Sequence, residues 1–94
     1  MFEIRLGEGG QVHVSGRLDA AESDQAGQVL RTLSGTTTVD CTQLDYISSA
    51  GIAVLMETYK RLLGQGHALR LVNLSPRVKN VFVYAGLDKL LGIT

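Results

Sequence analysis

Residues 39–55 read VDCTQLDYISSAGIAVL and predict a strand followed by a helix. Its first residues complete the segment 36–41 (TTTVDC), which is short and rich in β-branched side chains and therefore predicts a strand. Residues 42–46 are interpreted as a turn-like link. From Ser49 the apolar residues recur at helical spacing, which predicts a helix that glycines end at 64–66. Ser48 and Ser49 thus lie at the predicted junction between a strand and a helix.

The segment before this unit predicts a hairpin and a helix. Residues 2–6 and 11–15 alternate apolar and polar side chains on either side of a glycine turn, which is typical of paired strands. Asp19 and Glu22 have capping-box spacing and predict a helix that ends at residues 34–35. Its predicted buried face consists of Ala26, Val29, Leu30 and Leu33.

The segment after it predicts one more strand and one more helix. Residues 68–74 (ALRLVNL) indicate the strand, and Ser75 followed by Pro76 marks a helix start. Gly86 should close this helix, whose expected buried face is Val78, Val81, Phe82 and Ala85. Residues 87–94 are expected to form either an edge strand or a packed tail.

Together these elements predict an α/β fold in a single domain, residues 1–94. The order β-β-α-β-α-β-α indicates a mixed sheet of four to five strands with parallel neighbours and right-handed crossovers. Three amphipathic helices pack against it. On the long central helix, Ile52, Leu55, Met56, Tyr59, Leu62 and Leu63 should face the core, with Glu57 and Arg61 paired on the opposite side.

The composition excludes several classes of protein. Nine basic residues balance nine acidic ones, so no global charge attracts nucleic acid or an anionic membrane. We find no apolar run long enough for membrane insertion and no leader-like start, and we expect a cytoplasmic protein. Cys41, the sole cysteine, is interpreted as an inert core thiol.

Catalytic chemistry is not indicated. His13 lies in an alternating strand and His67 in a glycine-rich turn, and neither has a motif around it. Clustered carboxylates that would complete a metal site with them are lacking, and no phosphate-binding or dinucleotide glycine pattern occurs. We therefore expect no enzyme, no catalytic residue, no metal and no cofactor.

The two serines can be interpreted as having either of two roles. A serine at a helix start most often only caps the helix. A phosphate on such a serine would also be well accommodated by the free N–H groups and positive dipole end. It would add about −1.5 to −2 charge at pH 7.

Three segments resemble the STAS-domain anti-sigma factor antagonists of bacteria, the SpoIIAA and RsbV type. VSGRLDA (residues 14–20) is similar to the strand-G-x-L-D segment that leads into the first helix of the family. Residues 39–55 resemble its Y-[IM]-[DS]-S-[SA]-G-[LI] signature, and LVNLSPRVKNVF (residues 71–82) resembles its closing strand and S-P-x-V helix. The order and spacing match over nearly the whole chain.

This resemblance implies a STAS fold and a phosphorylation-switched, protein-binding regulator of transcription. By position the phosphoacceptor is Ser49, with Ser48, which fills a place where relatives often carry Asp, as a second candidate. Asp19, Ala50 and Gly51 would surround the site. The implied partners are an anti-sigma factor serine kinase of the GHKL type, which supplies ATP and Mg²⁺, and a PP2C-type phosphatase.

The helix face after the serines predicts where a partner binds. Ala53, Val54 and Glu57 fall outside the main buried stripe, although the first two can equally border the core. Two other functions remain open. One is a STAS subunit of a phospholipid-transport ABC complex, and the other is a signalling scaffold without a switch.

Overall fold

The computed structural model describes residues 1–93 and contains a four-stranded mixed sheet with three helices. The sheet order is β1-β2-β3-β4; β1 and β2 are antiparallel, and the other two pairs are parallel. The predicted element order and mixed sheet are therefore confirmed. The elements are β1 (Phe2–Leu6), β2 (Gln11–Leu18), α1 (Ser23–Leu30), β3 (Thr37–Ile47), α2 (Ser49–Gly64), β4 (Leu69–Val72) and α3 (Pro76–Tyr84).

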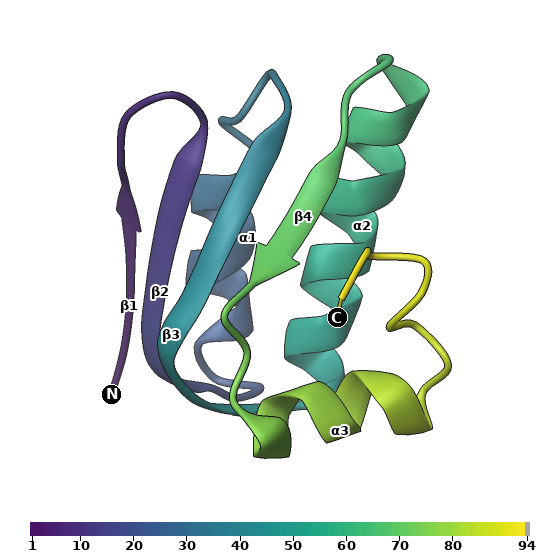
Figure 1. Cartoon of the computed structure of the whole chain (residues 1–94). Helices are drawn as coiled ribbons and strands as arrows, with labels where there is room; N and C mark the ends of the chain where they lie inside the picture. Colours follow the sequence, from purple (N-terminus) through teal and green to yellow (C-terminus); the bar gives the residue numbers. More distant parts are fainter. Residues whose placement is uncertain (94) are drawn as a thin grey trace.

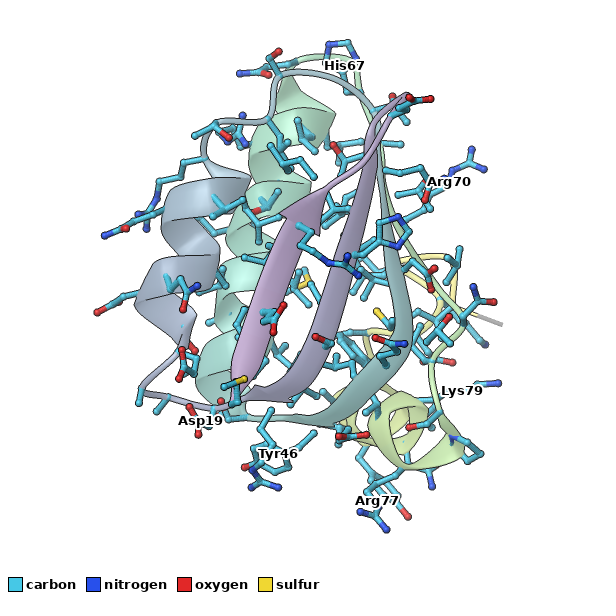
Figure 2. All side chains as sticks on the ribbon, turned by 90° about the vertical axis from the view of Figure 1, so that its left-hand side faces the viewer. Asp19, Tyr46, His67, Arg70, Arg77 and Lys79 are labelled. Carbon is cyan, nitrogen blue, oxygen red and sulfur yellow. The ribbon has the colours of Figure 1, made fainter. Side chains whose placement is uncertain are left out.

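Two helices cover one face of the sheet, and the third crosses its lower end. α1 and α2 lie behind the strands in Figure 1, while α3 runs below them beside the end of β3. Figure 2 shows side chains but no helix on the opposite face of β1 and β2. The core lies between the strands and the helices and includes Val12, Leu18, Val39, Leu44, Ile47, Leu30, Leu55, Leu62 and Phe82. Among the described residues, no helix has the length and apolar character needed to cross a bilayer.

β3 is longer than the sequence predicted. It runs for 11 residues, so the expected link at residues 42–46 is wrong. Its pairing with β2 shifts register twice, between His13 and Ser15 and between Gly16 and Arg17. Such β-bulges place an extra residue on one strand and break the period of two. Thr42 and Gln43 are consequently both exposed. The alternation of buried and exposed residues that would indicate a strand in the sequence is therefore interrupted here.

α1 begins one turn later than its capping signal indicated. The Asp19 carboxylate accepts a hydrogen bond from the Glu22 N–H at 3.1 Å, as expected for a cap. However, this bond closes an isolated turn, and the helix itself starts at Ser23, whose hydroxyl donates to the Asp19 carbonyl at 2.8 Å. Ala26 and Leu30 are buried as predicted, whereas Leu33 lies beyond the helix and is half-buried.

α2 turns a slightly different stripe toward the core than expected. Its buried residues are Gly51, Leu55, Thr58 and Leu62, so Leu63 is 55% exposed. The predicted Glu57–Arg61 pair is also wrong. Arg61 instead donates two hydrogen bonds to the carbonyls of Leu30 and Leu33 at 2.9 Å each, and Glu57 pairs with Arg31 at 3.3 Å.

α3 and the residues after it complete the core. Ser75 caps the helix, its hydroxyl accepting from the Val78 N–H at 3.3 Å. Val78 and Phe82 are buried, but Ala85, the C-cap of the helix, is exposed, contrary to the prediction. Residues 87–93 form a packed tail and no edge strand, with Leu91 and Ile93 buried.

Candidate functional site

The predicted site residues meet where β2 and β3 end. Leu18 and Ile47 are the last paired residues of these parallel strands, so Asp19 and Ser48 follow at the same edge of the sheet. The Ser48 N–H donates to the Leu18 carbonyl at 2.9 Å, which joins the two chain segments directly. In Figure 2 Asp19 and Tyr46 lie at this lower end of the molecule. The carboxyl edge of a parallel sheet is where binding sites gather in α/β folds.

The two serines have different structural roles. Ser48 is the N-cap of α2: it has extended backbone angles, and its hydroxyl accepts from the Gly51 N–H at 3.2 Å. Ser49 is the first residue of the helix and is exposed. Within residues 1–93 its hydroxyl makes no hydrogen bond. The Ser48 hydroxyl therefore takes part in the fold, whereas Ser49 is exposed and its hydroxyl has no hydrogen-bond partner among residues 1–93.

Gly51 allows α2 to start close against β2. A methyl group at this position would lie 2.8 Å from Leu18 Cγ and 3.0 Å from the Leu18 carbonyl oxygen. The same methyl would be 3.0 Å from Ile47 Cγ1. Real side chains do not come so near, so the small residue two positions after Ser49 is needed by packing. Ala50, between them, is half-buried.

The residues of the predicted partner-binding face of α2 differ in their exposure. Ala53 and Glu57 are exposed, and the Glu57 carboxylate reaches Arg31 on the neighbouring segment after α1. Val54 is half-buried and packs against the core, so it borders this surface. The exposed part of α2 next to Ser49 thus consists of small and acidic side chains.

One feature of this end was not anticipated from the sequence. The guanidinium of Arg17 stacks on the ring of Tyr46 at 4.3 Å from its centroid. These two residues are register partners on β2 and β3, one position before Leu18 and Ile47. Because residues 42–46 were interpreted as a link, this pairing could not have been found from the sequence.

A second polar group lies away from the serines, on the uncovered sheet face. One Asp40 carboxylate oxygen accepts from the Thr42 hydroxyl and N–H at 2.6 and 3.0 Å and from Asn73 at 3.2 Å. The other lies 3.4 Å from His13 Nδ1. The Thr42 hydroxyl, then Asn73, the Thr42 N–H and His13 lower the pKa of Asp40 to about 2, against a smaller opposing effect of burial.

This polar group lines a hollow of about 200 Å³ together with Arg5, Ser15 and Gln43. Although His13 and Ser15 share the hollow, no hydrogen bond joins them within residues 1–93, and the outer edge of the imidazole lies against Gly7. His67 lies at the opposite end of the molecule from Asp19 (Figure 2). In the described part of the chain, no three potential metal-ligating side chains cluster.

The comparisons with known proteins agree with this architecture. The family model described as "Mlab, STAS domain" matches residues 3–92. No curated protein sequence matches the chain. Among solved structures, unphosphorylated SpoIIAA, an anti-sigma factor antagonist, is 21% identical with a TM-score of 0.77, covering 100% of this chain and 99% of its own. Phosphorylated SpoIIAA from Bacillus is 21% identical with a TM-score of 0.72, covering 95% and 86%.

Similar domains also occur in other settings. The STAS domain of an anti-sigma factor antagonist from Rhodobacter sphaeroides is 16% identical with a TM-score of 0.62, covering 82% of this chain and 95% of that one. The murine anion transporter Slc26a9 is 21% identical with a TM-score of 0.69, covering 85% of this chain and 14% of the transporter. Family model and fold coincide over almost the whole sequence, and the chain belongs to the STAS domain family.

Proposed function

We propose that this STAS domain is an anti-sigma factor antagonist whose partner binding is switched by phosphorylation of Ser49. The observation that carries the proposal is the difference between the two serines. Ser48 is used as the cap of α2, whereas Ser49 is exposed at the positive end of a 16-residue helix, and its hydroxyl has no hydrogen-bond partner within residues 1–93. A modification of Ser49 therefore changes the surface and leaves the fold intact.

In the unphosphorylated state the partner, an anti-sigma factor serine kinase of the GHKL type, binds over the start of α2. Ala50 and Ala53 permit a close approach of its backbone. When the kinase carries ATP and Mg²⁺, the Ser49 oxygen attacks the γ-phosphorus. The bond to the β-phosphate oxygen breaks, ADP leaves, and the hydroxyl proton passes to a base of the kinase. The domain supplies the acceptor and no catalytic group.

The phosphate then changes what the surface can bind. It adds about −1.5 to −2 charge beside the chain segment of Asp19, while the N–H groups at the start of α2 stabilise it locally. The fold tolerates the group, but a kinase surface complementary to the neutral serine is rejected. A PP2C-type phosphatase would hydrolyse the phosphate ester and restore binding. That SpoIIAA, with the same fold, has been solved in both phosphorylation states supports this scheme.

Phosphate mapping tests the acceptor directly. The domain, its Ser49→Ala variant and its Ser48→Ala variant are each incubated with the partner kinase and Mg-ATP, and the phosphate is located by mass spectrometry. We expect one phosphate on Ser49 in the wild type and in Ser48→Ala, and none in Ser49→Ala. Loss of the cap should cost Ser48→Ala about 1 kcal/mol of unfolding free energy. Phosphate on Ser48, or none with an active kinase, contradicts the proposal.

Binding measurements separate the switch from an unswitched scaffold. Ser49→Asp should weaken kinase binding at least tenfold by calorimetry, because it places a charge at the contact, while Ser49→Ala should bind like the wild type. Ala53→Arg should also weaken binding, because the side chain would block the exposed face of α2. If Ser49→Asp binds as tightly as the wild type, the domain is a scaffold.

A second candidate function is a STAS subunit of a membrane-transport complex of the phospholipid ABC type. It is favoured by the Mlab description of the matching family model and by the STAS region of the anion transporter Slc26a9. Affinity purification of the tagged domain after cross-linking distinguishes the two candidates. A kinase among the partners favours the antagonist, whereas a permease and an ATPase favour the transport subunit.

A further inference from the structure

Within the described residues, 1–93, one edge of β1 is neither paired nor covered. It is the first strand in the sheet order, and no element lies beyond it in Figure 1. The other edge strand, β4, is flanked by the tail, since Leu90 and Leu91 line a groove with Leu69 and Arg70. An uncovered strand edge offers unpaired N–H and C=O groups to another strand.

The alternation of hydrogen bonds shows which residues of β1 face this edge. The Gly7 N–H donates to the Gln11 carbonyl at 2.7 Å, and the Arg17 N–H donates to the Met1 carbonyl at 2.9 Å. In an antiparallel ladder hydrogen-bonded pairs alternate with non-bonded pairs, so the odd residues 1, 3, 5 and 7 turn toward β2. The N–H and C=O groups of Phe2, Ile4 and Leu6 consequently point outward.

The sequence of β1, FEIRL, is self-complementary about Ile4. When a second copy pairs antiparallel with Ile4 opposite Ile4, Phe2 lies opposite Leu6 of the second copy, and Glu3 lies opposite its Arg5. All three outward-facing residues then exchange backbone hydrogen bonds. Sliding the pairing by two residues places either two Glu3 or two Arg5 side chains opposite each other, which is repulsive. The register centred on Ile4 thus forms the backbone hydrogen bonds and also places opposite charges across from each other.

The side chains agree with this register. Glu3 and Arg5 are exposed and form no ion pair within residues 1–93. In the symmetric pairing they occupy non-hydrogen-bonded positions, where opposite side chains come closest. On the helix side of the sheet Ile4 is half-buried and Leu6 is 57% exposed. Pairing would bring Ile4 against Ile4, and Leu6 against Phe2, of the second copy.

We propose that a second copy of this chain binds along β1, in the register centred on Ile4, and extends the sheet across a two-fold axis. The contact is isologous, so every interaction occurs twice. It involves only one short strand from each copy and is smaller than the roughly 1,200 Å² of a stable complex, so the dimer is weak and reversible. The antiparallel pairing turns the two Ser49 sites toward opposite ends of the joined sheet. Dimer formation and the proposed switch are therefore independent.

Charge exchange tests the register. Sedimentation equilibrium of the full chain, free of any N-terminal tag, should show masses rising from 10.1 kDa toward twice that value between micromolar and millimolar concentrations. Glu3→Arg and Arg5→Glu should each raise the dissociation constant about tenfold, because the symmetry applies each like-charge contact twice. The double variant Glu3→Arg/Arg5→Glu should restore the wild-type constant. Arg70→Glu, an equal charge change on the far edge strand, should have no effect.

Amide hydrogen exchange provides an independent readout. In the dilute monomer the amides of Glu3 and Arg5 should be protected by β2, whereas those of Ile4 and Leu6 should exchange quickly. At high concentration Ile4 and Leu6 should become protected as well. A monomer at every concentration, a dimer unaffected by the single charge changes, or protection gained elsewhere than at these amides overturns the proposal.

Discussion

Gly51 is the residue on which the geometry of the serine site most depends. It is buried at the first turn of α2, and its missing side chain lets the helix touch the end of β2. The contact includes a backbone carbonyl, which cannot turn aside as a flexible side chain can. Ser48 and Ser49 are held at the strand ends because this approach is possible.

Substituting Gly51 by alanine should therefore destabilise the domain. We expect Gly51→Ala to lower the free energy of unfolding by about 1–3 kcal/mol, as overpacking in a tight core does. Gly64→Ala, at the other end of the same helix, meets nothing within 4 Å and should be neutral or stabilising by up to about 1 kcal/mol. Urea unfolding measures both variants. Equal stabilities would contradict the close contact at Gly51.

Asp40 should make stability depend on acid pH. Its pKa falls from 3.8 to about 2 in the folded chain, so folding favours the charged form. The resulting stabilisation is complete above about pH 4 and is lost as the pH falls toward about 2. Thr42→Val removes the largest cause of the shift while keeping the side-chain shape. The drop in the urea midpoint between these pH values should be smaller in Thr42→Val than in the wild type, and an equal drop would contradict this role.

Among the elements, α1 depends on α2 for its C-terminal end. The helix has eight residues and no basic residue in its last turn. The guanidinium of Arg61 supplies the missing positive charge and hydrogen-bond donors, because it donates to two carbonyls at and just after the end of α1. Unsatisfied carbonyls at a helix end otherwise need a cap or water.

Removing this contact should weaken the packing of α1. We expect Arg61→Ala to lower the free energy of unfolding by about 1–3 kcal/mol, the range for hydrogen bonds to charged groups. Arg31→Ala removes an exposed ion pair with Glu57 and should change it by less than about 1 kcal/mol. Thermal unfolding measures the stability of both variants. Equal losses of unfolding free energy would show that the Arg61 hydrogen bonds stabilise the domain no more than the exposed Arg31–Glu57 ion pair does.

The elements that could be predicted are those whose pattern is local. The hairpin, the Ser75–Pro76 helix start and the long helix after Ser49 all follow from alternation, capping and period. The second half of β3 could not be predicted, because its bulges expose consecutive residues. The ends of α1 and the partner of Arg61 depend on contacts between distant segments. At the site, the family resemblance placed Asp19 near the serines, but only the structure separates the roles of Ser48 and Ser49.

For the molecule as a whole, Cys41 is a reporter of unfolding. It lies on β3 within the core and is 1% exposed, and burial raises the pKa of its thiol to about 12. The native thiol is thus both inaccessible and protonated. Reaction with a disulfide reagent should follow the fraction of unfolded chains as urea is added. Rapid modification in the absence of urea would mean that the sheet opens locally.

The two bulges of β3 have a consequence for how this sequence can change. Residues 37, 39 and 41 face the core, then 44, and then 47, so each extra residue inverts the alternation and the second one restores it. From His13 to Leu18 β2 advances five residues, whereas β3 advances seven between their partners Asp40 and Ile47. Deleting one of the two extra residues would therefore remove a bulge and leave Ile47 paired with Leu18, with the start of α2 still against β2. A third deletion in this segment would meet no bulge that could absorb it and would draw the serines back along the strand by about 3 Å.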